Sequence, residues 1–323
     1  MAKLELVPEL LRLVDVGRAC GHVALLASAA CAGRAPGSAG EQRAAEYLAD
    51  RLQAIGWPPL AEVGAHRDPF SLTVSELAGE PTLALAEAPA TAFVHLRDFC
   101  VDVQGAAGSG RARGETVWLG AMAAEDGLPD ALRGRVGVCW STPPVSGDQL
   151  RAAFEAYLQR VRRARDAGAS ALLQIAPRVD RRKVMAHCHE TPELPVLDVD
   201  PAIGRALFAP YPPPAVGQRG RSVELRVELE RREVYSAGNV MAGLGPHPIG
   251  AVVCAHYDHL GTLPDGRHFP GAADNASGVA VALEAAAAIA AAGDRLRRRL
   301  VLLFSAAEET GMFGARRFVE RFG

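Results

Sequence analysis

The sequence predicts an α/β fold, and three observations in the last third of the chain support this prediction. A short apolar strand is expected over residues 250–255, and a second, strongly apolar strand over residues 300–305. The alanine-rich stretch 276–292 lies between them and is followed by Gly293, which indicates a helix and its end. Strand, helix and apolar strand in this order predict parallel neighbours covered on both faces. We therefore expect a mixed, mostly parallel sheet between helical layers.

The first sixty residues are expected to be helical. Apolar residues recur at steps of three and four from residue 4 to about residue 30, and the glycine-rich stretch 33–40 ends this pattern. Ser38 followed by Glu41 is typical of a capping box, which predicts a second helix over residues 41–55.

The middle of the chain has a different texture, with short strand-like runs separated by glycines and prolines. A helix is expected over residues 149–168, and a short one near residues 203–207. Strands are expected within residues 70–118 and over residues 133–140, 171–175, 194–199 and 223–234. This region is therefore predicted to be a β-rich α+β domain.

Composition excludes several classes of function. The chain has 323 residues, 49% of them hydrophobic, and a net charge of −2, so it lacks the positive charge typical of proteins that bind nucleic acid or anionic membranes. No apolar run reaches the length of a membrane span. The run 23–32 resembles a signal-peptide core, but acidic residues precede it, and we expect a structural helix. No export signal is visible, which favours the cytoplasm by default, and the compartment stays open.

Polar side chains gather where the predicted strands end. His256 and Asp258 follow the first strand, Asp274 precedes the helix, and Glu308 and Glu309 follow the second strand. The carboxyl ends of parallel strands share one edge of a sheet, so these groups are expected to lie together. So many carboxylates without a positive partner in the same segments predict a divalent cation. Imidazole and carboxylate ligands suit zinc, with cobalt or manganese as alternatives.

Three motifs in this segment resemble those of the M28 family of co-catalytic zinc aminopeptidases. Their order, spacing and flanking glycines all agree with that family. The motifs are Cys254-Ala-His-Tyr-Asp258, Pro270-Gly-Ala-Ala-Asp-Asn-Ala-Ser-Gly278 and Phe304-Ser-Ala-Ala-Glu-Glu-Thr-Gly311.

The resemblance implies a role for each polar residue in a centre with two zinc ions. His256 would bind one ion, Glu309 the other, and Asp274 both. Glu308 would be the general base, and Asp258 would orient His256. The resemblance also implies a cis peptide bond between Asp274 and the next residue. Peptides are the expected substrates, no nucleic acid or membrane partner is expected, and the oligomeric state is unknown.

The resemblance extends along nearly the whole chain and implies three segments. Residues 1–90 and 226–323 would form a three-layer peptidase domain, and residues 91–225 would be an inserted protease-associated domain. The family pattern also requires an aspartate and a histidine ligand further along the chain, and neither is present. The sequence thus resembles a truncated peptidase whose sheet is incomplete at its carboxyl-terminal side.

Alternatives remain open at several positions. His259 and His268 are expected to be surface loop residues, and His187 to Glu190 a polar loop rather than a metal site, because the H-E-x-x-H pattern is absent there. The predicted activity is removal of amino-terminal residues from peptides. A carboxypeptidase-like or glutaminyl-cyclising relative, or an incomplete fragment acting as an interaction module, are the alternatives.

Overall fold

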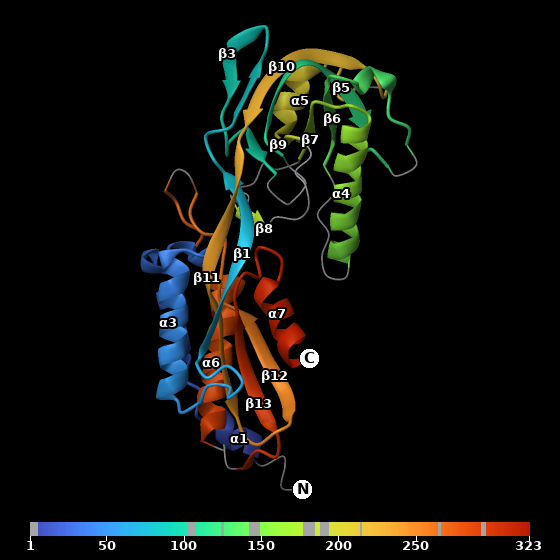
Figure 1. Ribbon diagram of the computed structural model, residues 1–323. Helices are drawn as coiled ribbons and strands as arrows, with labels where there is room; N and C mark the ends of the chain where they lie inside the picture. Colours follow the sequence, from blue (N-terminus) through green and yellow to red (C-terminus); the bar gives the residue numbers. More distant parts are fainter. Residues whose placement is uncertain are drawn as a thin grey trace. The chain divides into compact units, whose positions relative to one another are not determined.

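The computed structural model describes most of the chain, which divides into two compact units (Figure 1). Residues 1–73 and 233–323 form the first unit, and residues 74–232 form the second. The described residues are 6–102, 108–123, 126–141, 149–176, 185–187, 194–213, 215–263, 266–291 and 295–323. Among the helices they contain, none has both the length and the apolar character that a membrane crossing requires.

Three α-helices and one 3₁₀ helix open the first unit: α1 (Leu6–Leu11), α2 (Val16–Leu26), η1 (Ala29–Arg34) and α3 (Ala39–Ala54). The helical stretch expected from residue 4 to about residue 30 is thus divided into separate helices. Asp15 ends that continuity, because its backbone is extended and its side chain accepts a hydrogen bond from the backbone N–H of Arg18. The N-cap of α3 is confirmed, since Ser38 Oγ accepts from the backbone N–H of Glu41 at 3.1 Å, while the Glu41 carboxylate accepts from Gly37 rather than from Ser38.

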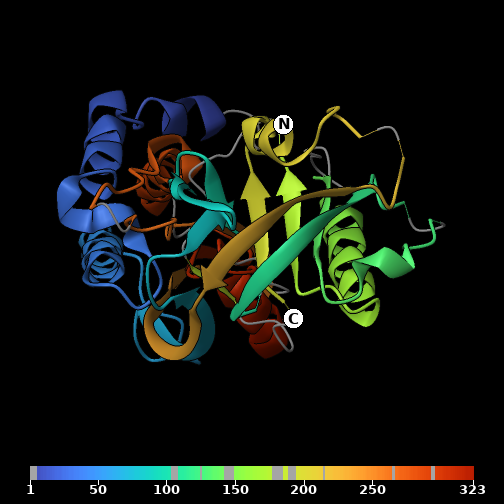
Figure 2. The same ribbon diagram turned by 90° about the horizontal axis from the view of Figure 1, so that it is seen from above.

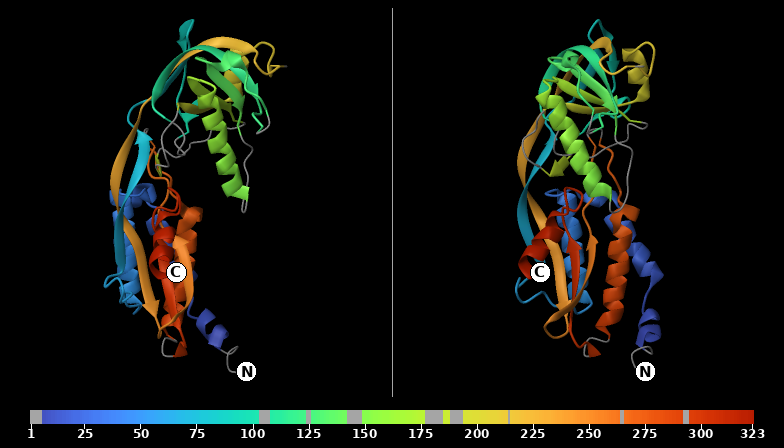
Figure 3. Two further views of the ribbon diagram at one scale, coloured as in Figure 1. Left: turned by 45° about the vertical axis from the view of Figure 1, so that its right-hand side comes forward. Right: turned by 90° about the vertical axis from the view of Figure 1, so that its right-hand side faces the viewer.

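The rest of the first unit contains the predicted strand–helix–strand segment. Its elements are β11 (Leu229–Leu244), β12 (Ile249–His256), α6 (Ser277–Ala290), β13 (Arg299–Ser305) and α7 (Phe313–Phe322). Its strands pair in the order β12-β13-β11-β1, where β1 is Arg67–Leu77, and the end of β1 that lies in the second unit pairs with β8 (Met185–His187) of that unit. Helices α6 and α7 lie on opposite faces of the strands, as Figure 3 shows.

The pairing within this sheet corrects one expectation. β12 and β13 are parallel, as the intervening helix predicts, but β11 pairs with β13 in the antiparallel direction. The sheet of the described residues is therefore mixed and not mostly parallel. The cause is that β13 inserts between β11 and β12, so that strands adjacent in sequence are not neighbours in the sheet.

The apolar alternation of β13 explains the two helical layers. Val301 and Leu303 share a core cluster with Phe318 of α7. Because successive side chains of a strand point to opposite faces, Leu302 and Phe304, which are also buried, lie on the α6 side.

The second unit is built on an eight-stranded sheet of order β3-β2-β10-β5-β6-β7-β9-β4. These strands are β2 (Thr82–Leu85), β3 (Ala88–Phe93), β4 (Phe99–Val101), β5 (Gly110–Gly120), β6 (Val136–Trp140), β7 (Ala171–Ile175), β9 (Val196–Val199) and β10 (Arg219–Val227). Helix α4 (Leu150–Asp166) lies alongside the sheet (Figure 2), with Val161 and Leu172 in one core cluster. Helix α5 (Pro201–Leu207) joins a different cluster through Ile203. The unit is thus β-rich with helices, while its identity as a protease-associated domain stays a prediction.

Candidate metal centre

The predicted site residues lie at the ends of three elements of the first unit. His256 is the last residue of β12, and Glu308 and Glu309 follow β13 within four residues. Asp274 lies in the turn Ala272–Ala276 that immediately precedes α6. The parallel register, in which His256 pairs with Ser305, brings the first two elements to the same edge of the sheet.

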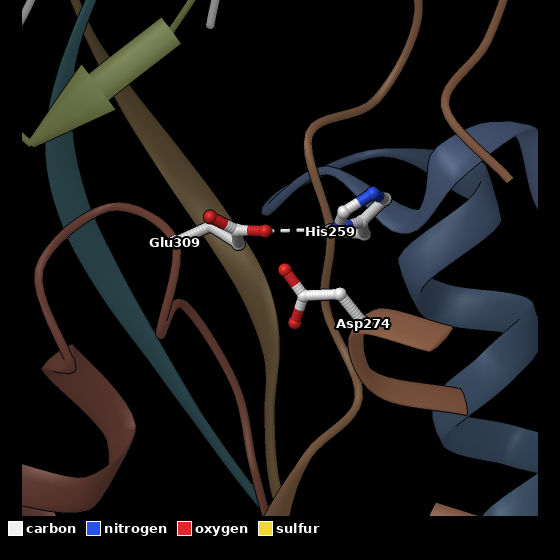
Figure 4. A group of neighbouring side chains, drawn as sticks. All are labelled: His259, Asp274 and Glu309. Carbon is white, nitrogen blue, oxygen red and sulfur yellow. Dashed lines mark hydrogen bonds and ion pairs between the residues drawn. The ribbon is translucent and has the colours of Figure 1, made fainter. Parts of the chain in front are cut away.

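Three side chains converge at this edge in a geometry that suits a metal ion. One ligand atom from each of His259, Asp274 and Glu309 lies within 4.8 Å of the others (Figure 4). His259 Nδ1 is 2.8 Å from Glu309 Oε1. The Asp274 side chain is 66% exposed whereas that of Glu309 is 11% exposed, so the centre opens to solvent on the Asp274 side. One imidazole and two carboxylates form a donor set that fits zinc.

His256 lies next to Asp274 as well. Its Nε2 lies 3.1 Å from Asp274 Oδ1 and 3.9 Å from Glu308 Oε2. Asp274 therefore lies near two imidazoles, one from His256 and one from His259.

Asp258 is fully buried and holds the glutamate pair in place. Its two carboxylate oxygens accept hydrogen bonds from the backbone N–H groups of Glu308, at 3.0 Å, and Glu309, at 3.1 Å. Burial raises the pKa of Asp258 to about 7, against the opposing effect of these hydrogen bonds and of His256. The nearest contact of His256 Nδ1 is the Asp258 backbone carbonyl, at 3.3 Å, while the carboxylate lies 3.8 Å away.

Comparison with known proteins places this segment in a family. The sequence pattern that defines peptidase family M28 matches residues 239–322. Residues 239–322 therefore belong to peptidase family M28. That segment contains all of the residues that form the candidate centre.

The M28 assignment agrees with the fold of solved structures. An aminopeptidase from Aneurinibacillus sp. strain AM-1 is similar over 98% of this chain and 68% of its own, with a TM-score of 0.69 and 19% identity. A zinc aminopeptidase from Bacillus subtilis covers 96% of this chain and 66% of its own, with a TM-score of 0.61 and 17% identity. A peptidase M28 precursor from Shewanella amazonensis SB2B is similar over 98% of this chain and 70% of its own length, with a TM-score of 0.66 and 16% identity.

At these identities the likeness shows the fold, and the chain spans about two thirds of the length of the structures it matches. Among curated protein sequences, none matches the chain.

Sequence reasoning missed one member of the candidate centre. His259 was expected to be a surface loop residue, but it is 8% exposed and its ring packs edge-on against Phe269. Its backbone N–H also donates to the carbonyl of Arg34, at 3.2 Å. The only signal in the sequence was its position three residues after His256. His268 is half-buried and is not part of the cluster of ligand atoms around Asp274.

Two further expectations concern single segments. The peptide bond between Asp274 and Asn275 is cis, which confirms what the M28 resemblance implies. The predicted polar loop from His187 to Glu190 lies largely outside the described residues, which include only the backbone of His187 in β8.

Proposed function

We propose that this chain is a zinc-dependent exopeptidase that removes amino-terminal residues from peptides. The convergence of His259, Asp274 and Glu309 within 4.8 Å, in a segment that belongs to family M28, carries the proposal. The fold is shared with structures described as aminopeptidases, one of them as a zinc aminopeptidase. These similarities support peptide hydrolysis as the reaction.

Four residues would hold two zinc ions in this centre. His256 lies 3.1 Å from Asp274, and Glu309 and His259 lie near the same carboxylate, so Asp274 would serve both positions. The aspartate and the histidine that the family pattern requires would complete the ligand set. When bound, the two ions would supply Lewis-acid polarisation of the scissile carbonyl and would lower the pKa of water. The protein's contribution is to hold the donors at the edge of a rigid sheet.

Glu308 is placed to move the proton of the attacking water. Its side chain is 38% exposed, which makes the carboxylate accessible to water, while its backbone is fixed by Asp258. In the proposed reaction Glu308 takes a proton from water as the water oxygen attacks the carbonyl carbon. The same carboxyl group then donates that proton to the departing amine.

The second unit fits the proposal as a protease-associated insertion. It occupies residues 74–232, between the two parts of the first unit in the sequence, and it is built mainly of β-strands. This assignment rests on the architecture of the unit alone.

The experiment that tests the function compares free and blocked substrates. Leucine p-nitroanilide is expected to be hydrolysed with zinc present, and N-acetyl-leucine p-nitroanilide is not, because the blocked compound has no free amino terminus. A metal chelator should abolish the activity, and added zinc should restore it. Cleavage of a carboxyl-terminal residue, cyclisation of amino-terminal glutamine, or no turnover of any substrate would contradict the aminopeptidase proposal and favour one of the alternatives.

A further inference from the structure

A buried arginine lies beside the metal centre, far from it in sequence. Arg34, at the end of η1, has no exposed surface. Its guanidinium donates hydrogen bonds to four backbone carbonyls: Leu26, Tyr257 at 2.6 Å, Pro270 at 3.0 Å and Gly271 at 3.0 Å. A fully buried arginine is rare unless its donors are satisfied, and here they bind backbone.

Three of these carbonyls belong to the two loops that carry metal-binding residues. Tyr257 stands between His256 and Asp258, and Gly271 lies three residues before Asp274. One guanidinium plane therefore connects both loops. Backbone pairing joins the two loops only at their far ends, where the N–H of Phe269 donates to the carbonyl of Gly261 at 2.9 Å, and Arg34 adds a direct link closer to the metal-binding residues.

The backbone around Arg34 adds to this link. The Arg34 carbonyl accepts from the N–H of His259, and the Gly33 carbonyl accepts from the N–H of Gly261 at 2.9 Å. Gly271 has a φ of +57°, and a Cβ at this position would lie 2.5 Å from Arg34 Nη2. Glycine is therefore required where the guanidinium reaches the second loop.

We propose that Arg34 is a positioning residue of the metal centre, which holds the loop of His256 to His259 and the loop before Asp274 at a fixed separation. It acts through backbone carbonyls and touches neither substrate nor metal. The predicted effect on zinc affinity rests on the proposed function. The predicted effect on the rigidity of the two loops can be measured by hydrogen exchange on metal-free protein.

The positive charge of Arg34 opposes metal binding, whereas its positioning of the two loops favours it. A positive group close to Asp258, Asp274 and Glu309 offsets their repulsion, which sequence reasoning assigned to a divalent cation alone. That charge by itself would weaken cation binding. Loss of an outer group that orients ligands typically costs 10–100-fold in metal affinity. We expect positioning to dominate, because four carbonyls would lose their buried donors together.

Three variants separate positioning from charge and from general stability. Arg34→Met removes the charge and all donors, and Arg34→Lys keeps the charge with fewer donors in a different geometry. Arg163→Met is the matched control, because Arg163 donates to the backbone carbonyls of Met122, Ala123 and Asp126 in the second unit. Zinc affinity is measured by competition with a chromophoric chelator, and hydrogen exchange is measured on metal-free protein.

The proposal predicts that Arg34→Met weakens zinc binding roughly 10–100-fold, that Arg34→Lys is intermediate, and that Arg163→Met matches the wild type. Hydrogen exchange in residues 256–261 and 270–276 should accelerate together in the Arg34 variants, while exchange in β13 stays unchanged.

The proposal is overturned if folded Arg34 variants keep the zinc affinity and the hydrogen exchange of the wild type. It is also overturned if Arg34→Met binds zinc more tightly while Arg34→Lys is unchanged. If Arg34→Met does not fold, the zinc affinity and the hydrogen exchange of Arg34→Lys decide whether the proposal holds. Absence of zinc binding in the wild type would contradict the proposed function alone, and the exchange result would still decide this inference.

Discussion

The two adjacent glutamates of the centre differ in burial and surroundings, and so in expected role. Glu309 is nearly buried and lies 2.8 Å from His259, while Glu308 is partly exposed and lies 3.9 Å from His256. This difference supports the assignment of Glu309 to metal binding and of Glu308 to proton transfer. The sequence alone showed only that two carboxylates follow a strand.

Substitution of each glutamate by glutamine should separate these roles. Glu308→Gln is expected to lower kcat by a factor of about 10²–10⁴ while zinc binding is retained, because only the proton acceptor is lost. Glu309→Gln is expected to weaken zinc binding itself. Both are measured by leucine anilide hydrolysis and zinc titration, with the exposed Glu320→Gln of α7 as control. Equal loss of zinc in both variants would contradict the division of roles.

Asn239 links the two ends of the glutamate loop. Its Oδ1 accepts from the backbone N–H of Ala306 at 3.1 Å, and its Nδ2 donates to the carbonyl of Gly314 at 2.8 Å. Asn239→Leu leaves both groups buried and unpaired, which should lower the free energy of unfolding by about 2–6 kcal/mol. Urea unfolding measures this loss, and Gln53→Leu on the exposed face of α3 is the control. A loss no larger than that of the control would show that Asn239 does not fix the loop.

At the scale of elements, strands and helices with strong local signals were predictable. The segment β12–α6–β13 and the Ser38 N-cap of α3 are confirmed because strand ends and caps are encoded within a few residues. The alternating strand expected over residues 223–234 is instead divided between β10 and β11. Apolar alternation continues across this division, and it does not specify which partner strand each half will pair with.

Long-range contacts explain what the sequence could not predict at the site. His256, Asp274 and Glu309 were found because each lies next to a predicted element end. The contributions of His259 and Arg34 depend on hydrogen bonds across 50 and more than 200 residues, respectively. No local pattern records such contacts.

The contact of α2 with α3 and α6 contains a titratable group whose effect can be measured. His22 is buried beside Tyr47, with Glu284 3.5 Å from its Nε2. Burial lowers the pKa of His22, although Glu284 acts in the opposite direction. The unfolded chain, with the ordinary pKa of about 6.5, then binds a proton more readily than the folded protein does.

The free energy of unfolding should therefore fall as the pH decreases below about 6.5, until the pH is below the folded pKa. The slope due to one group is at most about 1.4 kcal/mol per pH unit. His22→Asn removes the titration, so its curve should be flatter than that of the wild type between pH 7.5 and 5. Urea unfolding at several pH values provides the comparison. Parallel curves would show that His22 does not contribute in this range.

At the scale of the whole molecule, the chemistry resides in one of the two units. Every residue of the candidate centre, together with Arg34, belongs to the first unit, and the family M28 segment lies within that unit as well. The second unit has its own sheet and core clusters. The centre can therefore be tested through substitutions in the first unit alone.

The most direct test of the centre is the number of zinc ions bound by the wild type and by Asp274→Asn. Equilibrium dialysis followed by metal analysis gives this number per chain. We predict at least one equivalent for the wild type and its loss in Asp274→Asn, because the Asp274 carboxylate lies in the ligand cluster with His259 and Glu309. Failure of the wild type to bind zinc, or equal binding by both proteins, would contradict a centre built around Asp274.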